Sequence, residues 1–278
     1  MLSDHATAQL SVAILIALGV ASAWAFLRYY RQFDYGLARL PFFLIATIWT
    51  RVVWRAQVSG LLPDPGTGAI IICNHHSGND PAFVQLGLKR LPHWMVASEY
   101  SKAKWLAGMF RLLRAIPVSR AGVDTAATKA AIRFAQEGDL VGLFPEGRIN
   151  TTSAVLLPGR PGAAMIALRA RVPVIPCYIL DSPYDGTAWG FFFMTGKTRV
   201  VVGELIDISE YYGRENEKEV LEELTKKFLI EMARLAGVEN FQPQLAGRFY
   251  KPGLNGEPPA DDSRRARDLT GSRPLASA

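Results

Sequence analysis

The stretch AIIICNHHSGNDP, residues 69–81, decides the fold of this chain. Five apolar residues, 69–73, predict a short buried strand, and the polar residues after them predict a loop where that strand ends. His75 and Asp80 lie five positions apart in this loop, a spacing that would leave them about 140° apart on a regular helix. The loop must therefore fold back if the imidazole and the carboxylate are to meet.

The pair Asp80-Pro81 is typical of an N-cap followed by a proline at the first helical position. A carboxylate that orients an imidazole leaves the other ring nitrogen free to take a proton, which is the general-base arrangement used in acyl transfer. Two simpler interpretations stay open: Asp80 as a helix cap only, and His75 and His76 as polar loop residues or metal ligands. The sequence has no Cys/His cluster to complete a zinc set, so we expect no metal site.

A second motif follows another short apolar run. Residues 141–144, VGLF, predict a buried strand that leads into PEGRIN, residues 145–150. Charged side chains at the carboxyl end of a strand lie where open α/β sheets bind their ligands. Between the two motifs, residues 115–120 form a third apolar run that ends in Arg120. VPVIPCYI, residues 172–179, comes after them.

In their order and spacing, these four blocks closely resemble those of the glycerophospholipid acyltransferases, in particular the 1-acylglycerol-3-phosphate acyltransferase family. The resemblance covers residues 63–202, and the apolar N-terminus also fits it. It implies transfer of a fatty acyl group from acyl-CoA or acyl carrier protein to the free hydroxyl of a lysophospholipid. Many members have EGTRS in the third block where this chain has EGRIN, so the acceptor's head group stays open.

The resemblance makes His75 the general base and Asp80 its orienting partner. It assigns the acceptor's phosphoglycerol head to Arg120, Glu146, Gly147 and Arg148. Arginine suits this role because its planar fork stays charged and binds oxyanions in pairs. Structural roles remain open for the arginines as surface residues and for Glu146 as part of a salt bridge that shapes the loop.

Further candidates lie around these motifs. Arg160 precedes a run of good helix formers that starts at Gly162, a reasonable neighbourhood for a phosphate. By the same resemblance, residues 172–176 support the site or the acyl donor. The oxyanion formed at the attacked carbonyl needs donors, and we expect backbone N–H groups of residues 77–79 or of the turn after Phe144 to supply them.

Neither cysteine is needed as a nucleophile. Cys73 and Cys177 each lie in an apolar run, so we expect both to be buried residues of the core. Two such cysteines also fit a reducing compartment and no disulfide.

The N-terminal part of the chain predicts a membrane anchor. Residues 8–27 are apolar and uncharged, and 20 residues span the roughly 30 Å hydrocarbon core. A signal peptide fits less well because residues 1–7 carry no lysine or arginine. Arginines follow the span, so the positive-inside rule places the catalytic domain on the cytoplasmic face of the membrane. Residues 40–54 suit an interfacial helix, with a half-inserted hairpin and packing against the catalytic domain as alternatives.

Downstream, short apolar runs alternate with helical patterns. The sequence therefore predicts an α/β fold, a mixed sheet flanked by helices, with an N-terminal transmembrane or membrane-embedded helical anchor. The expected organisation is a transmembrane anchor in 1–35, an interfacial amphipathic helix in 36–60, an acyltransferase domain in 61–250 and a disordered tail in 251–278.

The charge balance indicates the partners. Thirty-one basic and 25 acidic residues give a net charge of +6, which is too mild to demand nucleic acid, and no nucleic-acid-reading motif accompanies it. We expect membrane lipids, a lysophospholipid acceptor and acyl-CoA or acyl carrier protein as partners, with no cofactor beyond the donor thioester. The rival functions are an acyltransferase for another head group, a lipid-binding protein without activity, and a hydrolase that uses the same His-Asp base.

Overall fold

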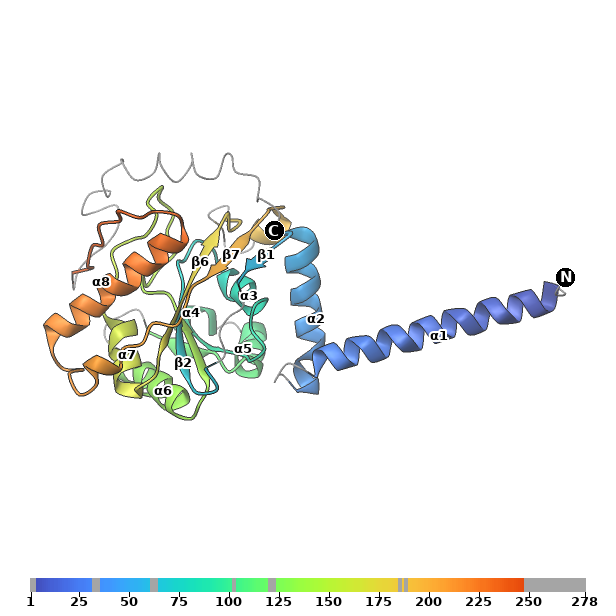
Figure 1. Cartoon of the computed structure of the whole chain (residues 1–278), viewed down its shortest axis with the longest axis horizontal. Helices are drawn as coiled ribbons and strands as arrows, with labels where there is room; N and C mark the ends of the chain where they lie inside the picture. The colour runs from blue at the N-terminus through green and yellow to red at the C-terminus, as the bar shows by residue number, and fades with distance from the viewer. Residues whose placement is uncertain are drawn as a thin grey trace.

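A computed structural model describes residues 4–31, 36–60, 65–101, 104–119, 124–184, 187 and 190–247. Its centre is a seven-stranded sheet in the order β1-β7-β6-β2-β5-β3-β4, with helices on both faces (Figure 1). Neighbouring strands run parallel except β6 and β7, which are antiparallel. The predicted mixed α/β sheet is therefore confirmed. The predicted tail and Arg120 lie outside the described residues.

The sheet consists of β1 (Gln57–Ser59), β2 (Ala69–Ile72), β3 (His93–Ala97), β4 (Ile116–Val118), β5 (Leu140–Leu143), β6 (Val174–Leu180) and β7 (Arg199–Val202). The apolar runs of the sequence account for all of them except β1. That strand has only three residues and a mostly exposed pattern, yet it pairs with β7. The sheet thus begins at Gln57, before the domain boundary expected after residue 60.

The helices of the domain are α3 (Asp80–Gln85), α4 (Ser98–Ser101), α5 (Lys104–Leu112), α6 (Thr125–Gln136), α7 (Gly162–Ala170) and α8 (Lys218–Leu235). Short 3₁₀ turns lie at η1 (Leu37–Arg39), η3 (Gly190–Phe193) and η4 (Ser209–Tyr211). Helix α6 begins with a side-chain N-cap, because the carboxylate of Asp124 accepts the backbone N–H of Ala127 at 2.9 Å.

Strand β2 lies in the middle of the sheet and is buried on both faces. Ile70 and Ile72 pack into the core that contains α6, α7 and α8, whereas Ala69 and Ile71 pack into the core that contains α3. This alternation follows from the two-residue period of a strand. Each fully buried isoleucine contributes roughly 1.5–3 kcal/mol, so the strand that leads into the His75 loop is firmly anchored.

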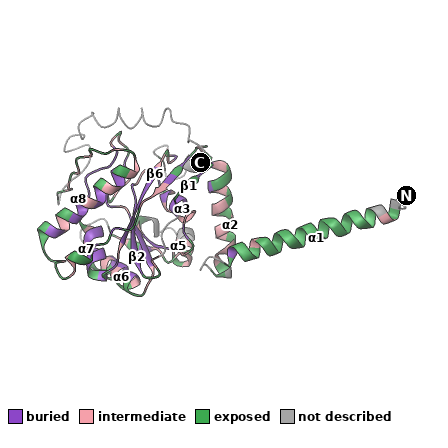
Figure 2. Cartoon of the chain, viewed as in Figure 1, coloured by how far each residue is buried: buried purple, intermediate pink, exposed green. Residues whose placement is uncertain are grey.

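Helix α1 (Asp4–Tyr30) extends away from the α/β domain, and its side chains are almost all exposed (Figures 1 and 2). Its segment Ala8–Tyr30 is long and apolar enough to cross a membrane. This is the helix in which the sequence predicts the membrane span.

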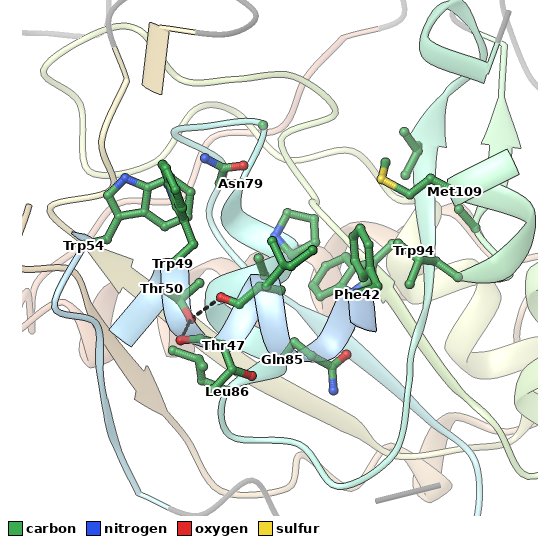
Figure 3. Close-up of a pocket in the computed structure, with 18 of the residues that line it drawn as sticks. Phe42, Thr47, Trp49, Thr50, Trp54, Asn79, Gln85, Leu86, Trp94 and Met109 are labelled. Carbon is green, nitrogen blue, oxygen red and sulfur yellow. Dashed lines mark hydrogen bonds between the residues drawn. The ribbon is translucent and has the colours of Figure 1, made fainter. Parts of the chain in front are cut away.

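Helix α2 (Leu40–Ile48) continues into a π-helical turn, η2 (Trp49–Val53). In this turn the hydroxyl of Thr50 donates to the carbonyls of Ala46 and Thr47, at 2.7 and 3.1 Å (Figure 3). The hydroxyl thus offers these carbonyls a side-chain partner where the regular helix ends.

The two sides of the α2–η2 helix differ. Thr50 and Trp54 are buried against the domain, as the packing alternative requires. On the opposite side Ile45, Ile48 and Val52 are 57–67% exposed. One helix therefore both packs on the α/β domain and presents an apolar ridge that suits a lipid interface.

Candidate active site

The loop between β2 and α3 folds back as the sequence requires. His75 Nδ1 lies 2.9 Å from Asp80 Oδ2. The same oxygen accepts the backbone N–H groups of His76, at 2.7 Å, and Ser77, at 2.8 Å. Asp80 is fully buried, so these hydrogen bonds replace water around its charge.

The N-cap assignment of Asp80 is wrong by one residue. Asp80 is the first residue of α3, Asn79 occupies the cap position, and Pro81 follows inside the first turn. The carboxylate of Asp80 is turned back toward its own loop, where its partners are His75 and the two N–H groups after it. It therefore orients the imidazole without capping the helix.

One face of the His75 ring stacks on an aromatic side chain. It lies on Phe144 with ring centroids 3.9 Å apart and planes 8° apart, and Phe144 stacks in turn on Trp94 at 5.2 Å. Because a carboxylate accepts at Nδ1, that nitrogen carries the hydrogen. Among the described residues no group bonds Nε2, and His75 lines a large cleft. Nε2 is therefore the nitrogen that can take a proton.

That cleft has a volume of about 960 Å³ and is mostly apolar. Its walls come from α2 and η2, from α3, from β3 and from α5, as Figure 3 shows for the labelled side chains. Among them are Phe42, Trp49, Leu86, Trp94 and Met109. A cleft of this size and lining suits a long hydrocarbon chain. The sequence did not predict that η2 would form one of its walls.

Glu146 joins the two motif loops. Its Oε1 accepts the N–H of His75 at 2.8 Å, and its Oε2 accepts the N–H of Leu157 at 2.8 Å. The side chain is 2% exposed, and burial raises the pKa of Glu146 to about 8, although both N–H groups act to lower it. Both oxygens are engaged with backbone, which favours a loop-shaping role for Glu146 over direct contact with substrate.

The turn after Glu146 is built around Gly147, whose φ is +70°. A Cβ there would come within 2.9 Å of Arg160 Cδ and Nε, so glycine allows the Arg160 side chain to lie on this turn. The backbone N–H of Arg160 also donates to the carbonyl of Pro145 at 2.9 Å. Arg148, half-buried, lies on the same turn. The structure thus groups Arg148 and Arg160 beside the loop that carries His75.

The ring of His76 contacts the backbone of Asn150 and not the carboxylate of Asp80. Its Nδ1 lies 3.1 Å from the carbonyl of Asn150, and the N–H of Asn150 donates to the carbonyl of His75 at 2.6 Å. Burial lowers the pKa of His76. Only its backbone, and not its ring, contacts Asp80. Its ring therefore has no orienting carboxylate of the kind that His75 has.

Two residues that hold the site did not emerge from sequence reasoning. The amide of fully buried Asn74 makes two hydrogen bonds with the backbone of Ile179, accepting at 2.6 Å and donating at 2.8 Å. The hydroxyl of Ser182 donates to Asp80 Oδ1 at 2.6 Å. Asn74 had a signal, a polar side chain directly after a buried strand, whereas Ser182 lies far along the chain and had none.

The structure leaves fewer backbone N–H groups available as oxyanion donors than the sequence suggested. The N–H of Ser77 already donates to Asp80, that of Asn79 to the Ser77 hydroxyl at 3.4 Å, and that of Gly147 to Phe144 at 2.9 Å. In the described part of the chain, no acceptor contacts the N–H of Gly78, which lies at the cleft. Of the 77–79 loop donors, Gly78 is therefore the one available to a substrate.

Both cysteines are free and buried, as expected. Burial raises the pKa of Cys177 to about 12 and that of Cys73 well above its ordinary value. Thiolate formation, which nucleophilic attack would need, is thereby disfavoured. Within the described ranges no group of three or more His, Cys, Asp or Glu side chains could hold a metal ion.

The sequence of this domain matches a known family. Residues 55–180, which run from just before β1 to the end of β6 and include both motif loops, match the family model described as Acyltransferase. The chain therefore carries an acyltransferase domain and is an O-acyltransferase.

Individual relatives agree with this class. The 1-acyl-sn-glycerol-3-phosphate acyltransferase of Bacillus subtilis (strain 168) is 29% identical over 149 residues, which cover 52% of this chain and 70% of that protein. An uncharacterized protein of Mycobacterium tuberculosis (strain H37Rv) is 31% identical over 46% of this chain and 38% of its own length.

A solved structure shares the fold. It is the 1-acyl-sn-glycerophosphate (LPA) acyltransferase PlsC from Thermotoga maritima, which superposes with a TM-score of 0.56 at 19% identity. The superposition covers 81% of this chain and 91% of that one. The mixed sheet with its flanking helices is thus the architecture of that enzyme.

Proposed function

We propose that this protein transfers a fatty acyl group from acyl-CoA or acyl carrier protein to the free hydroxyl of a lysophospholipid. The favoured acceptor is 1-acylglycerol-3-phosphate, and the product is then phosphatidic acid. The observation that carries the proposal is the pairing of His75 Nδ1 with buried Asp80, which leaves Nε2 facing an apolar cleft.

In this proposal His75 acts as a general base. Nε2 takes the proton of the acceptor hydroxyl while the hydroxyl oxygen attacks the thioester carbonyl, because an alcohol is a poor nucleophile at neutral pH. The new C–O bond forms, the C–S bond breaks, and the imidazolium returns the proton to the departing thiolate. Asp80 stabilises the imidazolium between these two steps. No acyl-enzyme is needed.

Other groups complete the proposed site. The N–H of Gly78 is placed to donate to the carbonyl oxygen as it gains charge. Arg148 and Arg160 supply guanidinium groups for the acceptor's phosphate, together with Arg120. The apolar cleft takes the acyl chain of a substrate that stays in the lipid phase.

The N-terminal elements support a location at the membrane. Helix α1 can span the bilayer, and the exposed ridge of Ile45, Ile48 and Val52 follows it in the chain. The arginines after the span place the catalytic domain on the cytoplasmic face in this proposal.

The test is thiol release by detergent-solubilised full-length protein given oleoyl-CoA, with and without lysophosphatidic acid, with the lipid product identified by mass. We expect release that depends on the acceptor and forms phosphatidic acid. Release only with another lysophospholipid would correct the acceptor, and release with free fatty acid as product would identify a hydrolase. If oleoyl-CoA and oleoyl-acyl carrier protein both fail with every acceptor, the proposal is wrong.

A further inference from the structure

We infer that Ser182 is a positioning residue for the reaction, because it holds the second oxygen of Asp80 and so fixes how that carboxylate meets His75. The inference rests on the proposed function, in which His75 is the general base. Ser182 lies in the connection after β6, 102 positions beyond Asp80 in the chain.

The two oxygens of Asp80 have different partners. Oδ2 accepts three hydrogen bonds, all from residues 75–77 of its own loop. Oδ1 accepts from the hydroxyl of Ser182 at 2.6 Å, and no other donor in the described ranges reaches it. Because Asp80 is fully buried, solvent does not take the place of this donor. Among the described residues, Ser182 is thus the one hydrogen-bond partner that ties the carboxylate to a segment outside its own loop.

The turn that ends β6 sets the position of Ser182. Asp181 has a φ of +57°, a left-handed conformation that residues with side chains seldom adopt. The hydroxyl of fully buried Thr198 donates to the carbonyl of Asp181 at 3.1 Å, which holds this turn against the start of β7. The two Asn74–Ile179 hydrogen bonds hold the catalytic loop against the same end of β6. The Ser182 hydroxyl therefore meets Asp80 between two fixed segments.

Removal of the hydroxyl has two consequences for the reaction. The carboxylate can rotate, so Oδ2 no longer holds Nδ1 in one direction, and the turnover number falls. A buried carboxylate that loses a charge-assisted hydrogen bond also has its charge less well satisfied. It then holds the protonated imidazole more strongly, so a higher pH is needed to free the base.

The experiment compares Ser182→Ala with Ser182→Thr, which keeps a hydroxyl. Ser209→Ala is the matched control, because Ser209 also donates to a carboxylate, that of Asp207 at 3.0 Å, but on an exposed turn. In Ser182→Ala we expect kcat to fall about 10- to 100-fold, the size of one charge-assisted hydrogen bond, with KM for both substrates nearly unchanged. The acid limb of the kcat profile should move to higher pH. Ser182→Thr should restore most of kcat, and Ser209→Ala should behave as the unaltered enzyme.

Two results would overturn the inference. One is an unaltered kcat and pH profile in Ser182→Ala. The other is a loss of kcat that accompanies a lower unfolding temperature while the acid limb stays in place, since a merely structural role would do this. His75→Ala, assayed in parallel, separates the two proposals. If it keeps turnover, the proposed function fails, and if it is inactive while Ser182→Ala is normal, only the role of Ser182 fails.

Discussion

The part of the chain that the structure describes contains two histidine–carboxylate pairs that look alike and differ in what they can do. His75 meets Asp80 at 2.9 Å and stacks on Phe144, and His93 meets Asp139 at 3.0 Å and stacks on Phe134. The centroid distance is 3.9 Å in both stacks. Neither the carboxylate nor the aromatic ring therefore distinguishes a reactive histidine from a structural one.

The difference lies in the second ring nitrogen and in burial. His93 is 2% exposed and lies between two acceptors, the Arg114 carbonyl at Nδ1 and Asp139 at Nε2. His75 has one ring partner, and the buried member of its pair is the carboxylate. His93 is the first residue of β3, whereas His75 lies in the loop that follows β2. A histidine with both nitrogens engaged ties elements together, and one with a free nitrogen at a cleft can move a proton.

The largest effect should come from His75→Ala. We expect kcat for acceptor-dependent thiol release to fall about 10²- to 10⁴-fold, since the attacking hydroxyl loses its base. The free energy of unfolding should fall by about 1–2 kcal/mol, because the variant loses the Asp80 hydrogen bond and the Phe144 stack, and the protein should stay folded. His76→Ala is the neighbouring control and should keep substantial activity. A dispensable His75 with an essential His76 would mean that the wrong base has been assigned.

The reverse outcome is expected at the second pair. His93→Gln loses at least one of the two ring hydrogen bonds and the stack on Phe134, so the free energy of unfolding should fall by about 1–3 kcal/mol. Chemical denaturation of both proteins measures this, and kcat of the folded variant should stay within about twofold of the original. A folded His93→Gln protein without activity would remove the distinction between the two pairs.

Glu146, which accepts the backbone N–H of His75 from the loop after β5, should also make stability depend on pH. Burial raises the pKa of Glu146 from 4.5 to about 8, so the folded chain binds its proton more tightly than the unfolded chain. Unfolding then releases a proton in this range, and the Glu146 contribution to stability is lost as pH rises from about 4.5 to about 8. Thermal unfolding across this range should show a shallower slope in Glu146→Gln. If stability depended on pH equally in both proteins, Glu146 would not be the group that binds this proton.

The smallest effects should come from the two stacked phenylalanines. Phe144→Leu and Phe134→Leu each remove one ring–imidazole stack, worth about 0.5–1.5 kcal/mol. We expect Phe144→Leu to lower kcat several-fold, because the His75 ring is less well oriented, and Phe134→Leu to lower only the unfolding free energy. If both changes lowered kcat by the same factor, the His93 pair would not be merely structural, and the distinction between the two pairs would fail.

The sequence predicted contacts that are local or that follow a buried strand. The His75–Asp80 pair could be predicted because both partners lie in one short loop, and every strand except β1 could be predicted because each is a short apolar run. The Asp80–Ser182 and His93–Asp139 contacts could not, since 102 and 46 residues separate the partners. They depend on the order of the strands, which no local pattern encodes.

Other differences also have physical causes. The helix after the loop begins at Asp80, one residue before its proline, and the carboxylate of Asp80 accepts from its own loop and does not cap the helix. The sequence left Glu146 open between a contact with substrate and a loop-shaping role, and its burial and two backbone partners favour the second. The phosphate-binding role of Arg120 stays a prediction.

Chemical rescue tests most directly the claim that His75 is the base. In His75→Ala the space above Phe144 and beside Asp80 is the size of the lost ring, so free imidazole can enter it. The account predicts that added imidazole restores acceptor-dependent thiol release with saturation, and that it fails to do so when Asp80→Asn is combined with His75→Ala. A folded His75→Ala protein that already works without imidazole would contradict the account.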